Sequence, residues 1–258
     1  MLLAIDIGNT NTVLGLFRED QLIEDWRIRT EVNATVDEFG ILIRSLFSTC
    51  QYPMDQVKHV IISCVVPPVL NAIDRFCRKY LNLIPLNVGP GIKTGMPIFY
   101  DNPKEVGADR IVNAVAAYEA FKRAVIVVDF GTATTFDYVS DRGEYLGGVI
   151  TPGIMISCEA LFQKASKLPR VEIFARPLSI LAKNTIASMN AGIVYGYSGL
   201  VEGIISRMKR EVGIDMKVVA TGGLALLIAD ECPAIDEVDD YLTLKGLKII
   251  FERNRKPL

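Results

Sequence analysis

The amino-acid sequence predicts an α/β protein of two lobes with like topology, each a mixed sheet with helices on both faces. The first observation is an apolar strand that ends in an acidic residue and a turn of Gly, Asn and Thr, between Leu2 and Thr12. The second is the return of that pattern nearly half the chain later, between Ala124 and Thr135. Each copy alone is short enough to be chance, but their half-length spacing indicates an internal duplication. We therefore expect an amino-terminal lobe over residues 1–118 and a carboxy-terminal lobe over residues 119–258.

The elements of the first half follow from local patterns. Thr35 and Glu38 have the spacing of a capping box and precede a stretch with helical apolar periodicity. Branched apolar residues run without interruption before Cys64, as in a strand buried on both faces, and Pro67-Pro68 is typical of a helix start. Strands are expected at residues 2–7, 12–17, 21–28 and 57–64, helices at 36–47, from 67 and at 105–121, and a Gly/Pro-rich loop at 89–103.

The second half repeats this alternation of strands and helices. Thr221-Gly222-Gly223 separates a predicted strand from a helix, and this layout directs backbone N–H groups and a helix dipole at an anion. Strands are expected at residues 124–129, 136–139, 144–151 and 217–220, and helices up to 161, at 186–212 and at 224–230.

Composition and charge exclude several classes of function. Half of the residues are apolar and 22% are charged, which is a globular composition. The net charge of -2 gives no electrostatic footprint for nucleic acid or an anionic membrane. Residues 184–201 carry no charge but are too polar for a membrane span, and a buried helix fits them better. We expect a small-molecule substrate or a second copy of the chain as partner.

The amino terminus and the cysteines indicate a cytoplasmic protein. The chain begins with a short apolar run that Asp6 interrupts, without the basic region of a secretory signal. The five cysteines are scattered and form no C-x-x-C pair, so they are expected to be reduced thiols in or near the core.

The turn after the first strand has the composition of a phosphate-binding loop. Gly8 lets the backbone approach a phosphate closely. The donors that can reach its oxygens lie in the next four residues, Asn9, Thr10, Asn11 and Thr12. Asp6 is itself an anion, so we expect it to hold Mg²⁺, directly or through water. An ordinary polar hairpin is the alternative, which the second copy of the motif disfavours. By itself the loop predicts phosphate binding. Together with the second copy of the motif it predicts a two-lobed kinase that transfers the γ-phosphoryl group of ATP to a small-molecule hydroxyl.

Four motifs carry a more specific resemblance. They are Asp6-Ile7-Gly8-Asn9-Thr10, Gly107-Ala108-Asp109-Arg110, Asp129-Phe130-Gly131-Thr132-Ala133-Thr134 and Thr221-Gly222-Gly223. Together they resemble the type III pantothenate kinases, a family of the acetate and sugar kinase, Hsp70 and actin superfamily, over almost the whole chain. The resemblance implies a duplicated ribonuclease H-like fold, as in actin-like ATPases. It also implies phosphorylation of pantothenate to 4'-phosphopantothenate, the first step of coenzyme A biosynthesis.

Asp109 matches the catalytic base of that family. Its position at the start of an apolar helix suits an acidic cap as well as a base. The chain has a single histidine, His59, which directly precedes an apolar strand and is expected to be structural. A carboxylate is therefore left to accept the proton of the alcohol. In a loose phosphoryl-transfer transition state that proton leaves late, so the base does not require a strongly raised pKa.

The resemblance also assigns a pantothenate pocket and a dimer. It places Tyr100, Gly107, Ala108, Asp109, Arg110 and Thr185 in the pocket. Arg110 suits the carboxylate of pantothenate, with a local ion pair as the alternative. In relatives the position of Thr185 reaches a site across a homodimer interface. Two pairs of glycines four positions apart, Gly192 with Gly196 and Gly199 with Gly203, indicate close helix packing, either between subunits or within the chain.

Asp129 and Thr132 are the site residues of the second motif. The resemblance makes Asp129 the ligand of a monovalent cation, K⁺ or NH₄⁺, and Thr132 a contact of ATP. A second carboxylate that organises Mg²⁺ is the competing role for Asp129. Two other functions remain as alternatives: a kinase of the same superfamily that acts on a sugar or carboxylate, and a nucleotide-binding regulator without activity. The regulator is disfavoured because Asp6 and Asp109 are both present.

Overall fold

The structure, a computed structural model, describes residues 1–171 and 176–255. The chain forms two compact units, Met1–Ala116 with Leu242–Leu258, and Ala117–Tyr241. The chain passes from the first unit to the second between Ala116 and Ala117, close to the expected boundary between residues 118 and 119. The chain then returns to the first unit, to which the last helix, Leu242–Asn254, belongs. The first unit is therefore discontinuous in sequence, which the division at 118 and 119 did not include.

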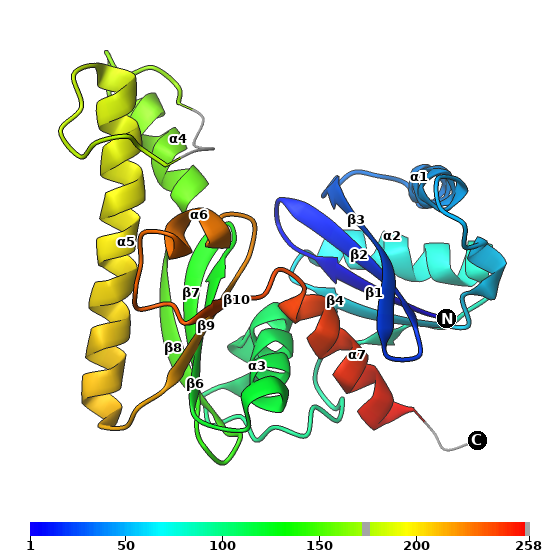
Figure 1. The fold of residues 1–258 in the computed structure, drawn as a ribbon. Helices are drawn as coiled ribbons and strands as arrows, with labels where there is room; N and C mark the ends of the chain where they lie inside the picture. The colour runs from blue at the N-terminus through cyan, green and yellow to red at the C-terminus, as the bar shows by residue number, and fades with distance from the viewer. Residues whose placement is uncertain (172–175, 256–258) are drawn as a thin grey trace. The chain divides into compact units, whose positions relative to one another are not determined.

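The first unit is built on a five-stranded mixed sheet of order β3-β2-β1-β4-β5 (Figure 1). β1 pairs antiparallel with β2 and parallel with β4, and the β2–β3 pair is antiparallel. The strands are β1 (Leu2–Ile7), β2 (Asn11–Arg18), β3 (Gln21–Arg29), β4 (His59–Cys64) and β5 (Leu86–Asn87). The longer helices are α1 (Val36–Ser48), α2 (Pro67–Phe76), α3 (Ala108–Phe121), which continues into the second unit, and α7 (Leu242–Asn254).

One face of this sheet packs on α1 and α2. The core joins alternate residues of the strands with the apolar stripes of the helices, among them Leu3, Ile5, Ile7, Phe39, Ile43, Ile73 and Phe76. The capping box is present as expected: the Thr35 amide donates to Glu38 Oε2 at 2.7 Å and the Glu38 amide donates to Thr35 Oγ1 at 3.3 Å. These two bonds satisfy amide groups that the first turn of α1 leaves unpaired.

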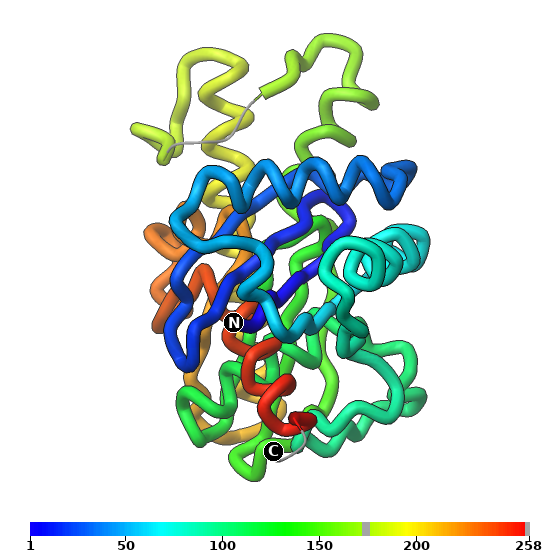
Figure 2. Tube along the Cα trace, turned by 90° about the vertical axis from the view of Figure 1, so that its right-hand side faces the viewer, coloured from blue at the N-terminus to red at the C-terminus, as the bar shows by residue number. Residues whose placement is uncertain are grey.

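The opposite face of the sheet carries α7, which was not expected from the sequence. The helix lies beside β1 and β4, next to the amino terminus in Figure 2, and the ring of Phe251 lies 5.0 Å from that of His59. Its Gly246 packs against α3, where an added Cβ would lie 2.2 Å from the carbonyl oxygen of Val112. His59 thus has the structural strand-end environment predicted for it.

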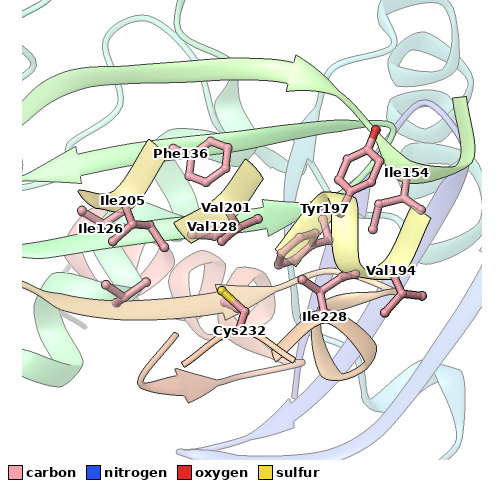
Figure 3. Packing of buried hydrophobic residues seen from close by; sticks show 14 of the residues in the cluster. Ile126, Val128, Phe136, Ile154, Val194, Tyr197, Val201, Ile205, Ile228 and Cys232 are labelled. Carbon is pink, nitrogen blue, oxygen red and sulfur yellow. The ribbon is translucent and has the colours of Figure 1, made fainter. Parts of the chain in front are cut away.

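The second unit contains a five-stranded sheet of order β10-β9-β6-β7-β8. Its strands are β6 (Val125–Phe130), β7 (Ala133–Val139), β8 (Tyr145–Pro152), β9 (Lys217–Thr221) and β10 (Glu237–Val238), and its helices are α4 (Ile154–Lys164), α5 (Thr185–Val212) and α6 (Ala225–Ala229). Figure 3 shows the core between the sheet and α5, in which Val128 and Phe136 of the sheet lie close to Val201 of the helix. No helix in the described part of the chain has the length and apolarity needed to cross a membrane.

The two sheets have the same topology, which confirms the duplicated fold. β1 and β6 are the central strands, each antiparallel to the following strand and parallel to a later one, β4 or β9. Asp6 and Asp129 occupy the same place, the last but one residue of the central strand. The helix over residues 186–212 is confirmed, with Thr185 as its first residue. α3 begins at Ala108 and not at 105, because Pro103–Glu105 form a separate 3-10 turn.

Candidate active site

The predicted phosphate loop is a tight turn between β1 and β2. The Gly8 amide donates to the carbonyl of Asn11 at 3.0 Å, and an added Cβ on Gly8 would lie 3.1 Å from that oxygen. Asn9 and Thr10 are exposed at the tip of the turn. Asp6 is half-buried at the end of β1, in register with Val13 on β2 and Ser63 on β4. The turn thus presents exposed donors beside a carboxylate that is fixed by the sheet.

A residue outside the motif, Thr30, holds the turn in place. Its hydroxyl donates to the Gly8 carbonyl at 2.7 Å, and its amide donates to the Thr10 carbonyl at 3.0 Å. The Thr12 hydroxyl lies 2.9 Å from Thr30 Oγ1, and because the single Thr30 proton is used on Gly8, Thr12 is the donor. Thr12 is 1% exposed. Its hydroxyl therefore supports the turn from within and is not presented to a phosphate.

We expect Thr30→Val to raise the KM for ATP about 2- to 10-fold with a smaller change in kcat. The substitution removes the hydroxyl bond to Gly8, and a hydrogen bond of this kind contributes about 0.5–1.5 kcal/mol. Steady-state kinetics with varied ATP measures the effect. Thr30→Ser keeps the hydroxyl and should behave as the unmodified protein. Thr49→Val, which removes a hydroxyl bonded to the Leu46 carbonyl at the end of α1, is the matched control. Equal KM values for ATP in Thr30→Val and in the control would contradict the role of Thr30 in holding the turn in place.

The Gly107–Arg110 motif places a half-buried carboxylate at the start of α3. Asp109 is the second residue of the helix, and its Oδ1 accepts from the Arg110 amide at 2.8 Å. An added Cβ on Gly107 would lie 2.4 Å from the same oxygen, so a glycine there leaves room for the carboxylate. Arg110 is itself buried, with 7% exposure. The motif is therefore a compact unit in which each residue type is required by the position of Asp109.

Burial gives Asp109 the electrostatics of a proton acceptor. Loss of solvent raises the pKa of its carboxyl above the ordinary value, while the amide and the charge of Arg110 act in the opposite direction. The raised pKa makes the carboxylate a stronger base than an exposed aspartate. The hydrogen bond to the Arg110 amide is also a helix-terminal contact, so capping and proton acceptance are compatible in one side chain.

Tyr100 and Thr185, the two residues assigned by resemblance alone, lie in different units. Tyr100 is half-buried in the extended segment that precedes the 3-10 turn of the first unit. Thr185 is exposed and is the first residue of α5 in the second unit. The side chain of Asn184 caps this helix by accepting from the Ala187 amide at 2.9 Å. No local pattern in the sequence marks either residue as part of a pocket.

In the second unit Asp129 lies against a glycine turn. It pairs in register with Thr135 on β7 and Thr221 on β9. Gly222 has a φ of +96°, and an added Cβ there would lie 2.7 Å from Asp129 Oδ1. Thr132 is half-buried in the turn after β6, where its carbonyl accepts from the Gly153 amide at 3.1 Å. The carboxylate of Asp129 is thus placed among hydroxyl and backbone groups, a polar environment suited to an ion.

Ser63 is a further polar residue that sequence reasoning did not select. It is fully buried, and its hydroxyl has no hydrogen-bond partner within the described residues. Buried hydroxyls are paired in most proteins, so a group that the chain does not supply, such as water or a bound ligand, fits beside it. The only mark of Ser63 in the sequence was its place directly after the apolar run Val60-Ile61-Ile62. Its pairing with Asp6 on β1 is visible in the structure alone.

The donor set at Asp6 fits Mg²⁺ held through water and phosphate. Among the described residues no group of three or more His, Cys, Asp or Glu side chains could hold a metal. Mg²⁺ usually keeps several waters and is held by one or two carboxylates together with substrate phosphates, so a single aspartate beside a phosphate loop suffices. The carboxylate of Asp6 and the hydroxyl of Ser63 supply oxygen atoms of the kind that Mg²⁺ prefers.

Comparisons with known proteins agree with these motifs. The family model for type III pantothenate kinases matches residues 2–207. The chain is 78% identical to the type III pantothenate kinase of Syntrophobacter fumaroxidans over 256 residues, covering 99% of both chains. It is 63% identical to that of Syntrophus aciditrophicus over 254 residues, covering 98% of this chain and 100% of the relative.

Among solved structures the likeness extends to distant proteins and concerns the fold alone. Component A of the (R)-2-hydroxyglutaryl-CoA dehydratase of Acidaminococcus fermentans aligns with a TM-score of 0.56 at 12% identity, covering 98% of this chain and 99% of the other. The inorganic polyphosphate/ATP-glucomannokinase of Arthrobacter sp. strain KM aligns with a TM-score of 0.53 at 17% identity, covering 98% of this chain and 99% of the other. The motifs, the duplicated sheets and the full-length identity lead to one conclusion: the chain belongs to the type III pantothenate kinase family.

Proposed function

We propose that this protein transfers the γ-phosphoryl group of ATP to the primary hydroxyl of pantothenate, giving 4'-phosphopantothenate for coenzyme A biosynthesis. The observation that carries the proposal is the half-buried, largely desolvated Asp109, placed beside Gly107 at the start of α3 in a chain of this family. Asp109 accepts the proton of the attacking hydroxyl. Its raised pKa suits this step, because proton transfer is efficient when the pKa of the base approaches the working pH.

ATP is assigned to the loop from Gly8 to Thr12, in which Thr12 acts by holding the turn from within, and to Thr132. The exposed tip residues Asn9 and Thr10 donate to the phosphates, while the backbone at Gly8 allows close approach. Asn11 contributes through its backbone, since its carbonyl closes the turn by accepting from Gly8. Mg²⁺ is assigned to Asp6, held directly or through water. When bound, Mg²⁺ neutralises charge on the β- and γ-phosphates, and Asp6 fixes where that charge is placed.

Pantothenate is assigned to the Gly107–Arg110 segment together with Tyr100 and Thr185. The guanidinium of Arg110 recognises the carboxylate of pantothenate through a charge-assisted contact. The low exposure of Arg110 supports this role over a surface ion pair, because a buried cation interacts with an anion more strongly than an exposed one. Asp129 is assigned a monovalent cation, K⁺ or NH₄⁺. We place the reaction in the cytoplasm, consistent with five free cysteines, all within the described residues.

A homodimer is supported by the surface of the second unit. The outward side of α5 carries Gly192, Gly196 and Gly199, all exposed, and an added Cβ on any of them meets nothing within 4 Å. Close packing within the described chain therefore does not explain these glycines. Large apolar side chains are exposed on neighbouring segments: Ile150, Met155, Ile156, Leu178, Ile180, Leu181 and Ile186. An apolar area of this kind is typical of an interface. Thr185 begins the same helix, which places it beside the interface.

We expect Gly196→Leu to dissociate the dimer. Glycine lets a partner helix approach closely, and a leucine side chain would separate the two backbones. Size-exclusion chromatography with light scattering measures the mass. Glu211→Leu, which introduces the same side chain near the exposed end of the same helix, should leave the dimer intact. A monomeric unmodified protein, or a Gly196→Leu variant of dimer mass, would overturn the assignment.

An acceptor screen tests the proposed reaction. The purified protein is supplied with Mg-ATP, KCl or NH₄Cl, and either pantothenate, sugars or acetate, and ADP release is followed by a coupled assay. We expect release with pantothenate only. Release with a sugar or carboxylate, and none with pantothenate, would identify a different kinase of the superfamily. ATP binding without release for any acceptor in either salt would indicate a regulator.

A further inference from the structure

One face of the second sheet carries a line of polar side chains. Asp129 on β6 and Thr135 on β7 are directly paired, so their side chains point to the same face with Cβ atoms about 4.5–5.5 Å apart. Their neighbours Val128 and Phe136 point to the other face, into the apolar core seen in Figure 3. Asp137 follows Thr135 by two positions and therefore lies on the Asp129 face. The sheet thus places two carboxylates on one face with a hydroxyl between them.

The proton of the Thr135 hydroxyl is directed at Asp137. Thr135 Oγ1 donates to Asp137 Oδ2 at 3.1 Å. On the other carboxylate oxygen, the Tyr145 hydroxyl donates to Asp137 Oδ1 at 2.6 Å. Asp137 and Tyr145 are 1% and 0% exposed, so this network is shielded from water. An ionised carboxylate only accepts hydrogen bonds, which fixes the direction of both bonds.

This direction determines what Thr135 can bind. A hydroxyl has one proton, and once that proton is donated the oxygen can only accept a hydrogen bond or ligate a cation. It cannot donate to a phosphate oxygen. Carbonyl, carboxylate and hydroxyl oxygens are the ligands that hard cations prefer. Thr135 therefore offers a neutral oxygen beside the negative charge of Asp129, which suits a monovalent cation and not an anion.

The first unit provides an internal comparison. Asp6 holds the place of Asp129 and is paired with Val13 and Ser63, whereas Asp129 is paired with Thr135 and Thr221. The hydroxyl on the parallel strand is common to both units. On the antiparallel strand, the first unit has Val13 followed two positions later by Gly15, where the second has Thr135 followed by Asp137. The oriented hydroxyl is thus a feature of the second unit that the duplication does not require.

We propose that Thr135 is a ligand of the monovalent cation at Asp129, and that Asp137 and Tyr145 are positioning residues that orient its hydroxyl. The inference rests on the cation site of the proposed function and adds residues to it. Thr135→Val is the direct test, because it introduces in the second unit the residue type that the first unit carries at this position. It keeps the β-branched shape of the side chain and removes the oxygen ligand together with its hydrogen bond to Asp137.

The test uses the full-length protein and two measurements. In the first, thermal unfolding is followed in increasing KCl, with NaCl added to hold ionic strength constant. In the second, binding of Tl⁺, a probe for K⁺ sites, is followed by ²⁰⁵Tl NMR. We expect K⁺ to raise the Tm of the unmodified protein, since a ligand bound only by the folded state stabilises it. For Thr135→Val we expect at least a 10-fold weaker K⁺ and Tl⁺ affinity. Its Tm in NaCl alone should be lower, because the hydrogen bond to Asp137 is lost, and the effect of K⁺ is measured from that lower Tm.

Three further variants separate the roles. Thr135→Ser restores the hydroxyl and should restore cation affinity. Tyr145→Phe removes the hydroxyl that donates to Asp137 Oδ1 and should give an intermediate loss. Thr151→Val removes a hydroxyl that donates to the Thr134 carbonyl at 3.3 Å, away from the polar line, and should bind K⁺ normally. Unchanged K⁺ affinity in Thr135→Val would overturn the role of Thr135 alone. If the unmodified protein shows no K⁺ effect in either measurement, the cation site at Asp129 fails as well.

Discussion

Asp109→Asn is expected to reduce kcat about 10²- to 10⁴-fold while the protein remains folded, since a positioned general base contributes about this much to a rate. The amide of asparagine cannot take the proton of the attacking hydroxyl. Its oxygen can still accept from the Arg110 amide, as Asp109 Oδ1 does at 2.8 Å, so the start of α3 keeps its geometry. ADP release at saturating Mg-ATP and pantothenate measures the loss. Asp55→Asn, at an exposed aspartate of the same unit, is the control.

The pH profile of the same variant distinguishes a base from a cap. Burial raises the pKa of Asp109, so activity should fall as the pH drops through that raised value, where the carboxylate takes up a proton. The acid limb of kcat should therefore have its midpoint above the ordinary pKa of 3.8, and it should be absent from the residual activity of Asp109→Asn. A variant that retains both its rate and its acid limb would contradict the assignment of Asp109 as the base.

The raised pKa of Asp109 also predicts the stability of Asp109→Asn. Because most carboxylates in folded proteins have a lowered pKa, the effect of pH on stability is opposite here. A folded-state pKa above the unfolded one favours the protonated form, so its stabilising effect is present at acid pH and is lost as the pH rises through the raised pKa. At neutral pH the ionised Asp109 therefore opposes folding. Removing this charge should leave the Tm at pH 7 equal to or above that of the unmodified protein, measured by thermal unfolding. A large fall in Tm would show that the loss of activity reflects misfolding.

Gly246→Ala should lower stability by about 1–3 kcal/mol, the usual cost of overpacking a tight contact. In an exposed helix the same change would stabilise by up to about 1 kcal/mol, because glycine is a poor helix former. Here the new Cβ would lie 2.2 Å from the Val112 carbonyl oxygen and 2.7 Å from its Cγ1, and the backbone atom cannot rotate away. α7 and α3 must therefore move apart.

Differential scanning calorimetry measures this effect. For a protein of this size, about 1–3 kcal/mol corresponds to a fall in Tm of roughly 2–12 °C. Gly89→Ala, where an added Cβ meets nothing within 4 Å, is the control and should unfold within a degree or so of the unmodified protein. A Tm for Gly246→Ala at or above the unmodified value would mean that the contact with Val112 is not tight in solution.

The parts of the fold that could be predicted from the sequence are those with local signals. The capping box at Thr35 and Glu38 involves neighbours in the chain, and the apolar periodicity of α5 is continuous over its whole length. The equivalence of Asp6 and Asp129 was predicted because the strand and turn around each are contiguous. The short strands β5 and β10 have two residues each and take their conformation from their neighbours, so no sequence pattern marks them.

The candidate site was predicted only as far as its contiguous motifs extend. The bond from Thr30 to Gly8 joins residues that are distant in sequence, and so does the contact that turns the Thr12 hydroxyl inward to Thr30. Likewise the direction of the Thr135 hydroxyl depends on Tyr145, on the next strand. Tyr100 and Thr185 came from family resemblance, and they remain predictions. Motifs thus indicated which chemistry to expect, whereas strand pairing determined which hydroxyl groups are available for it.

The return of the chain to the first unit has a consequence for synthesis on the ribosome. β1 is made before the second unit, yet the helix that covers one of its faces, α7, is made after that unit. During translation the apolar face under Leu244 and Leu247 therefore stays open while the whole of the second unit is synthesised. A ribosome that stops before Leu242 releases a protein with this face exposed, a substrate for chaperones or proteases.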